Sequence, residues 1–152
     1  MKSIFLTAAA LLSTLFLTTP ISATEKLTPK QQLLETRECH GCDLSNVNLK
    51  GAHLIGVDLR NANLEGANLE QANLEGADLT GANLNSANLT NAFANSTTFD
   101  YTNLTNANLS EANLYNAQVN GAVMIGTNIS GADGLDINLG IGGEEEELRI
   151  NE

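Results

Sequence analysis

The chain has few aromatic residues, few cysteines and few basic residues. Only 4% of its 152 residues are aromatic and it has no Trp, so its core must be built from smaller aliphatic side chains. Two Cys are too few for a disulfide-rich scaffold. Seven basic against 18 acidic residues give a net charge of −11, which argues against nucleic acid or an anionic membrane surface as a partner. The sequence is instead dominated by 24 Leu, 20 Asn and 18 Ala.

The first 23 residues have the pattern of a secretory signal peptide. Lys2 provides a positive start, residues 4–17 are apolar and uncharged, and Ala23 places a small residue at the expected cleavage site. The apolar stretch is shorter than the roughly 20 residues of a membrane span, so we expect no stable membrane insertion after cleavage, with an uncleaved N-terminal anchor as the alternative. Cleavage removes one Lys and no acid, which changes the net charge from −11 to −12. We therefore expect an exported protein.

Leucine recurs at every fifth position from Leu44 onward. The series runs through 18 centres to Ile129 without an insertion or deletion, and 13 of the centres are Leu. The residue two before each centre is usually Ala, and the residue just before it is Asn or Asp in 13 of 18 units. The position two after the centre is rich in Gly, Asn and Ser, which are turn residues.

A period of five fits neither regular secondary structure. On an α-helix five residues advance by about 500°, so successive leucines would spiral around every face. On a straight strand an odd period places each Leu on the opposite face from the last. Leucine can stay on one side only if the backbone turns once per unit. We therefore predict a narrow solenoid with Leu and Ala inside and Asn outside, whose coils stack about 4.8 Å apart.

The five-residue units resemble the pentapeptide-repeat family, whose pattern is A-[D/N]-L-x-x. Residues 62–66 (ANLEG) and 77–81 (ADLTG) match that pattern, and the resemblance covers residues 42–133 with a weaker continuation to Leu139. It implies an all-β fold, a right-handed quadrilateral β-helix with four units in each coil. Residues 20 positions apart would then stack.

Stacking at this interval predicts how polar residues are distributed over the solenoid. Glu65, Glu70 and Glu75 fall on three different sides, so their charges are kept apart. One side carries an unbroken series of asparagines, for which we expect a ladder of side-chain amide hydrogen bonds. Its members are Asn48, Asn68, Asn88, Asn108 and Asn128.

Two carboxylates are the exception to this separation of charges. Asp58 stacks under Asp78, with Arg60 close by in the sequence. Two like charges this close favour the neutral form of one of them. We therefore expect either a raised carboxyl pKa or compensation by Arg60.

One side of the solenoid departs from the repeat. Ala94 replaces an inward Leu and would leave a void costing a few kcal/mol, unless the larger inward residue Phe99 fills it. The same side carries outward apolar and aromatic residues on a surface otherwise made of Asn, Thr and Glu. We interpret them as a candidate interaction patch, with local tolerance around an imperfect unit as the alternative. The patch consists of His53, Ile55, Phe93 and Tyr115.

Both ends of a solenoid expose an open edge that needs a cap. Thr28 followed by Pro29 and Gln31 has the signature of a capping box, so we predict a short helix over residues 28–40 that Gly41 ends. The glutamates at 144–147 predict a solvated acidic tail. The expected parts are a signal peptide (1–23), a capping segment (24–41), the β-helix (42–139) and a disordered tail (140–152).

Cys39 and Cys42 form the one motif with potential chemistry. The pair follows the predicted helix, whereas a thioredoxin-like dithiol begins at a helix N-terminus. Asp43 stands where a c-type haem site needs His, and a metal site from the two cysteines with His40 or His53 would lack a fourth protein ligand. In an exported protein we expect a structural disulfide, with free thiols, a metal site and redox catalysis as the alternatives.

The sequence favours a non-catalytic protein with a structural or protein-interaction role. It shows no convergent nucleophile–base pair and no Gly-rich phosphate loop, and we expect no cofactor. The stretch 33–44 resembles the segment that precedes the repeats in many cyanobacterial and chloroplast-lumen members of the family, which implies the periplasm or the thylakoid lumen. The alternatives are a DNA-mimic topoisomerase inhibitor, which export argues against, and a redox or metal module at Cys39 and Cys42. The partner and the oligomeric state stay open.

Overall fold

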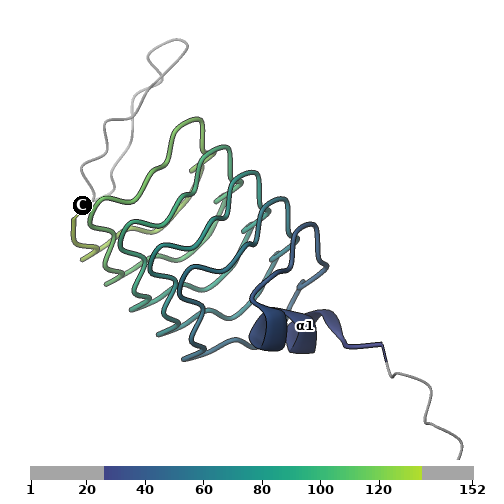
Figure 1. Cartoon of the computed structure of the whole chain (residues 1–152). Helices are drawn as coiled ribbons and strands as arrows, with labels where there is room; N and C mark the ends of the chain where they lie inside the picture. The colour runs from purple at the N-terminus through teal and green to yellow at the C-terminus, as the bar shows by residue number, and fades with distance from the viewer. Residues whose placement is uncertain (1–25, 135–152) are drawn as a thin grey trace, which may run out of the picture.

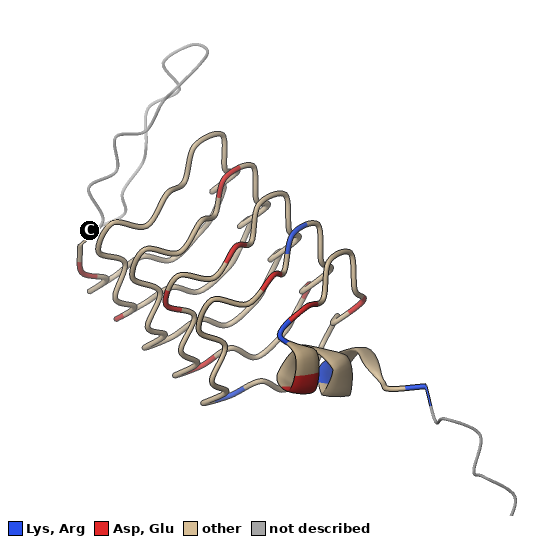
Figure 2. Cartoon of the chain, in the orientation of Figure 1, with Lys and Arg blue, Asp and Glu red and all other residues tan. Residues whose placement is uncertain are grey.

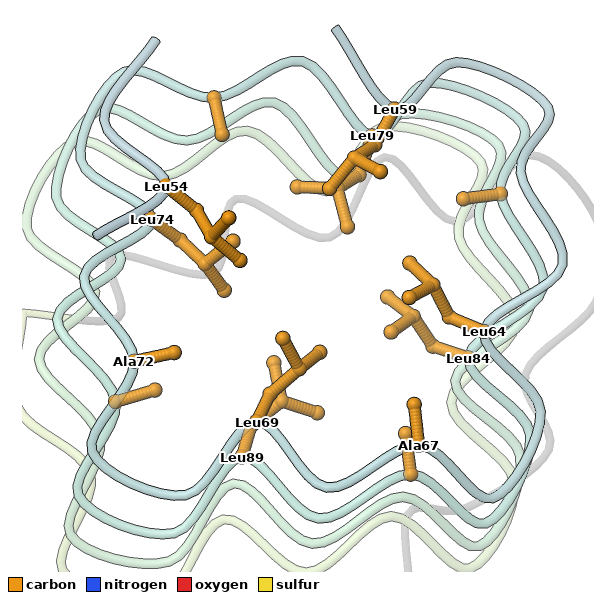
Figure 3. Packing of buried hydrophobic residues seen from close by; sticks show 14 of the residues in the cluster. Leu54, Leu59, Leu64, Ala67, Leu69, Ala72, Leu74, Leu79, Leu84 and Leu89 are labelled. Carbon is orange, nitrogen blue, oxygen red and sulfur yellow. The ribbon is translucent and has the colours of Figure 1, made fainter. Parts of the chain in front are cut away.

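The computed structural model describes residues 26–134, in which a short N-terminal helix is followed by a solenoid wound around a single axis (Figure 1). Sixteen parallel β-bridges connect its layers, and every one joins two residues that are 20 positions apart. Each coil therefore contains four five-residue units, which form the four sides seen down the axis (Figure 3). Within the described residues the bridges are isolated, so the coil consists of single bridging residues and turns rather than of longer strands.

The core is a stack of leucine and alanine layers. Leucines such as Leu54 and Leu74 point into the interior from corresponding positions in successive coils (Figure 3), and both are fully buried. Alanines such as Ala67 and Ala72 supply the smaller inward side chain between them. Burial of a Leu side chain contributes about 1.5–3 kcal/mol. The repeated inward positions are those that the five-residue period predicts.

Backbone hydrogen bonds join each coil to the next. The Leu64 N–H donates to the Asn83 carbonyl oxygen at 2.7 Å, and the Gly66 N–H donates to the Asn85 carbonyl oxygen at 2.9 Å. Within the unit, the Ala67 N–H donates to the Leu64 carbonyl oxygen at 3.0 Å and closes a turn. This pattern recurs along the coil, so the narrow solenoid satisfies its backbone polar groups without continuous strands.

The turn of each unit requires a residue with a positive φ. Gly66 adopts a φ of 64°, and Asn61 adopts 55° at the equivalent position of the preceding unit. A positive φ at the third residue is the feature of a type II turn, and Gly and Asn adopt it at the lowest cost. Tyr101 and Glu111 also occupy this position, each with a φ of 57°.

The asparagines serve their own turns as well as the stack. The Oδ1 atom of Asn68 accepts the Glu70 N–H at 3.0 Å, and Asn88 accepts the Thr90 N–H at 3.1 Å in the same way. Asn and Asp side chains commonly bond the backbone two residues on. The sequence analysis did not anticipate this role, although that local signal was present.

The predicted asparagine ladder is stacked as expected but is only partly hydrogen-bonded. Bridges join all five members in order, yet only Asn128 donates its amide to the residue below it, Asn108, at 3.0 Å. A continuous ladder occurs on the neighbouring side instead, where each amide donates to the side-chain oxygen one coil below at 3.1–3.2 Å. That ladder consists of Asp43, Asn63, Asn83 and Asn103.

Helix α1 (Pro29–Thr36) lies at the N-terminal end of the coil (Figure 1). Thr28 forms the predicted capping box with Gln31. The predicted helix over 28–40 is too long, because Arg37 adopts a left-handed φ of 62° and ends the helix. Gly41 does not end the helix and instead takes the positive-φ turn position of the first unit of the coil.

The coil also begins earlier than predicted. Glu38 forms a bridge with Asp58, and the Cys39 N–H donates to the Asp58 carbonyl oxygen at 2.8 Å. The first unit thus starts four residues before position 42. This unit is difficult to recognise in the sequence, because Cys39 rather than Leu occupies its inward centre.

Two basic side chains join the capping segment to the open edge of the first coil. The Lys30 Nζ donates to the Asn48 carbonyl oxygen, and the Arg37 Nη1 donates to the Ile55 carbonyl oxygen, each at 2.7 Å. Leu33 is fully buried and provides the apolar contact of the cap. These contacts satisfy backbone acceptors that have no preceding coil to pair with.

Within residues 26–134 no helix is long and apolar enough to cross a membrane. The predicted signal peptide (1–23), the last part of the predicted β-helix (135–139) and the predicted acidic tail (140–152) lie outside the described residues.

Candidate interaction face

The four residues of the predicted patch lie on one side of the solenoid, which we call the interaction face. His53, Asn73 and Phe93 form successive bridges of a single column, so one asparagine separates the histidine from the phenylalanine. Ile55 is 44% exposed, Phe93 52% and Tyr115 54%. The apolar residues thus share a side of the molecule but do not form one continuous apolar surface.

A groove of about 500 Å³ lies beside Phe93. It runs between this face and the adjacent corner of the coil, where the turn residues Gln71, Asn91 and Glu111 stack 20 positions apart. The groove was not predicted from the sequence, although the 20-residue interval already aligns these turn residues. The groove is lined by Gln71, Asn91, Ala92, Phe93, Glu111, Ala112, Asn113 and Asp133.

The unit that carries Phe93 disturbs the polar network around it. Among the described residues, the buried Oδ1 atom of Asn113 has no hydrogen-bond partner. In regular units this oxygen accepts the N–H two residues on, but the Tyr115 N–H donates to the Asn95 Oδ1 at 3.1 Å instead. A buried unpaired acceptor costs about 1–3 kcal/mol. Such local departures from the repeat are expected where function opposes stability.

The core adapts to the same irregular segment. Ala94 is fully buried, and Phe99 is the largest fully buried side chain of the described residues. Thr97 and Thr102 take inward positions, and their hydroxyl groups donate to the carbonyl oxygens of Leu74 and Phe99, each at 2.7 Å. The buried hydroxyls therefore keep hydrogen-bond partners.

Charge is distributed unevenly along the axis (Figure 2). Residues 61–134 contain no Lys, Arg or His and seven acidic residues, whereas residues 26–60 contain five Lys or Arg, two His and four acidic residues. The Lys50 Nζ pairs with Glu70 Oε1 at 2.8 Å, and Arg60 pairs with Asp58 at 2.7 Å and with Asp78 at 3.7 Å. No ion pair within residues 26–134 involves Glu111 or Asp133.

Arg60 compensates the stacked pair Asp58 and Asp78, and the pKa of Asp58 is lowered rather than raised. The Arg60 Nε and Nη2 donate to the two carboxylate oxygens of Asp58 at 2.9 and 2.7 Å. These hydrogen bonds lower the pKa of Asp58 from 3.8 to about 2, although partial burial opposes the shift. Of the two outcomes expected from the sequence, compensation by Arg60 is the one that occurs.

Cys39 and Cys42 lie at disulfide distance, with their sulfur atoms 2.06 Å apart. Cys39 is fully buried at the inward centre of the first unit, and the Cys42 N–H donates to the Cys39 carbonyl oxygen at 3.1 Å across the turn. The Cys39 Sγ also lies 3.4 Å from the carbonyl oxygen of Pro29 in α1. The pair therefore sits inside the first coil, beneath the cap, rather than behind a longer helix. No group of three or more potential metal ligands occurs within residues 26–134.

Comparison with known proteins identifies the repeat. The family model described as "Pentapeptide repeats" matches residues 38–76, 62–100, 77–114 and 102–133. The chain belongs to the pentapeptide-repeat family. The start of the match at residue 38 agrees with the first bridge of the coil.

Several solved pentapeptide-repeat proteins are similar to this chain. Rfr23 from the cyanobacterium Cyanothece 51142 is 29% identical with a TM-score of 0.49, over 68% of this chain and 91% of that protein. A protein from the Arabidopsis thaliana thylakoid lumen is 37% identical with a TM-score of 0.37, over 68% and 69%. The protein alr5209 from Nostoc Pcc 7120 is 30% identical with a TM-score of 0.40, over 61% and 84%. Among curated proteins, none matches this chain.

Proposed function

We propose that this pentapeptide-repeat protein is a non-catalytic protein-interaction module of an exported compartment, and that it binds its partner through the interaction face. The supporting observation is the half-exposed pair Phe93 and Tyr115, which shares one face of the solenoid with the exposed Ile55. Exposed aromatic side chains provide large contact areas and are enriched where proteins bind one another. Asn113, which is stacked on Phe93, has an unpaired buried acceptor, so the hydrogen bonding of the repeat is interrupted at this place.

Two observations support export to the periplasm or the thylakoid lumen. Residues 1–23 have the signal-peptide pattern, and Cys39 and Cys42 lie at disulfide distance. Disulfides persist in oxidising compartments and are rare in the cytosol. We also propose that the solenoid is the right-handed quadrilateral β-helix that the family resemblance implies. The 20-residue coil supports its four sides.

Affinity capture from an extract of the native compartment tests this function. We expect the wild-type protein to retain a partner that the double variant Phe93→Asn, Tyr115→Asn loses. Tyr101→Asn is the matched control, because Tyr101 is 72% exposed and lies outside the predicted patch. Capture of the same proteins by all three forms would contradict the proposal.

Inhibition of a topoisomerase by DNA mimicry is the second candidate. The absence of basic residues from positions 61–134 favours it. The 20-residue coil opposes it, since Glu65, Glu70 and Glu75 fall on separate sides and form no continuous acidic track. A gyrase supercoiling assay with the mature protein distinguishes the two functions, and inhibition at a stoichiometric concentration would support the mimic.

A further inference from the structure

We propose that the groove beside Phe93 binds the cationic side chain of a basic segment in a partner protein. This inference rests on the proposed function and names the chemistry of the partner. A guanidinium or ammonium group would lie over the Phe93 ring and pair with the carboxylates of Glu111 and Asp133.

The groove presents hydrogen-bond acceptors and one aromatic ring. Glu111 and Asp133 provide carboxylates. Phe93, which lines the same groove, is 52% exposed. A Cβ atom at Gly131 would meet the Glu111 carboxylate, so this carboxylate extends toward the coil that carries Asp133. A cation over an aromatic face is attracted by the ring, and a carboxylate beside it adds a charge-assisted hydrogen bond.

Residues 26–134 provide no basic side chain to the groove, so we expect its cation to come from a partner protein. No Lys, Arg or His occurs between residues 61 and 134, and the ion pairs of the basic residues before them go to Asp58, Glu70 and Asp78. Within residues 26–134 no ion pair engages Glu111 or Asp133, so their carboxylates can pair with a partner. Arginine fits best, because its planar group stacks on a ring and bonds a carboxylate through two donors.

Other classes of ligand fit the groove poorly. A divalent metal needs at least three converging ligands, and the described residues contain no such group. Phosphates, nucleic acids and anionic lipid surfaces would meet two carboxylates without a compensating base. Charge complementarity thus selects a cationic occupant.

The test uses a synthetic peptide of alternating arginine and alanine, blocked at both ends, with a citrulline peptide of the same length as the neutral control. Binding to the mature protein is followed by isothermal titration calorimetry and by NMR shifts of the amides around the groove. We expect saturable binding that weakens with added salt. The citrulline peptide should show no measurable binding.

Variants locate the site. Phe93→Leu and Glu111→Gln should each weaken binding about twofold to tenfold, the range expected for one cation–π contact or one exposed ion pair. Glu65→Gln is the matched control, since it removes the same charge from another side of the coil. Thermal unfolding of each variant establishes that the coil is intact.

Two outcomes would overturn the inference. The first is the absence of saturable binding of the arginine peptide. The second is an equal loss of binding in Glu65→Gln and Glu111→Gln, which would indicate attraction by net charge alone. If capture of a partner still depends on Phe93 and Tyr115, the proposed function stands and only the cationic chemistry is wrong. If capture does not depend on them, the proposed function fails as well.

Discussion

The ring of Tyr101 lies against the backbone of Gly121, the residue stacked one coil further along. A Cβ atom at position 121 would lie 2.8 Å from the Cδ1 and Cε1 atoms of that ring. Both residues occupy turn positions with positive φ, 57° for Tyr101 and 65° for Gly121. Glycine at this place therefore supplies space for the neighbouring side chain in addition to its backbone conformation.

Replacement of Gly121 by Ala is expected to destabilise the coil more than replacement of Gly76 by Ala. Both substitutions place Ala at a positive φ, which costs about 1–2 kcal/mol. A Cβ at Gly76 meets nothing within 4 Å, whereas one at Gly121 meets the tyrosine ring and adds about 0.5–1.5 kcal/mol for displacing that ring from its rotamer. Urea unfolding measures both values.

The excess cost at position 121 should disappear when Tyr101 is also replaced by Ala. This double variant separates the contact from the backbone effect. Equal stabilities of the two single glycine variants would show that the ring does not rest on Gly121 in solution.

Phe93 is expected to be dispensable for folding, whereas Phe99 is not. In Phe93→Asn the new Oδ1 can accept the Asn95 N–H, as the Asn88 Oδ1 accepts the Thr90 N–H, and the new amide N–H can donate to the unpaired Asn113 Oδ1. We expect these bonds to offset the half-buried ring to within about 1 kcal/mol. Phe99→Ala empties a fully buried position and should cost about 3–5 kcal/mol. Thermal and urea unfolding compare the two, and a loss above about 2 kcal/mol in Phe93→Asn would make Phe93 a structural residue.

The ion pair between Asp58 and Arg60 should make stability depend on pH in acid. The pKa of Asp58 is lowered from 3.8 to about 2 in the folded protein, so its contribution is present above pH 3.8 and is lost as the pH falls through about 2. Arg60 is half exposed, so we expect no more than about 1 kcal/mol, and less at high salt. Arg60→Gln should flatten the stability profile between pH 4 and 2. An unchanged profile would contradict the pairing.

Reduction of Cys39 and Cys42 is expected to loosen the N-terminal coil. A disulfide across so short a loop contributes about 2 kcal/mol in the chain-entropy model. The double variant Cys39→Leu, Cys42→Ala places the repeat's own residues at both positions and should lose sensitivity to reductant. Mass spectrometry of the non-reduced protein should show two hydrogens fewer than the thiol form. The full thiol mass in protein from the native compartment would favour free thiols.

The solenoid could be predicted from the sequence because one local rule repeats without interruption. A side chain at every fifth position can stay inside only if the chain turns once per unit, and the 20-residue bridges follow from four such turns. The end of α1 could not be predicted. Arginine rarely adopts the left-handed conformation that Arg37 has here, and glycine, as at position 41, is the more usual residue at a helix end. The first unit was hidden because Cys39 replaces its leucine.

The candidate site was predicted in part. Exposure of Phe93 and Tyr115 follows from their outward positions in the unit. The groove depends on the direction in which the Glu111 side chain extends and on which N–H donates to the Asn95 Oδ1. Both depend on side-chain conformation, which the repeat does not determine. The lowered pKa of Asp58 depends on the same kind of detail, since Arg60 could have turned to solvent.

The 20-residue coil also restricts how such a protein can change in length. Insertion of one five-residue unit would keep every leucine inside, yet it would rotate all later surface residues by one side. If the unit were inserted between residues 71 and 111, Gln71, Asn91 and Glu111 would no longer share a corner, and the groove would be lost while the fold survived. Only the gain or loss of a whole 20-residue coil leaves the surface columns aligned. The groove therefore depends on the 20-residue interval, whereas the core depends only on the five-residue interval.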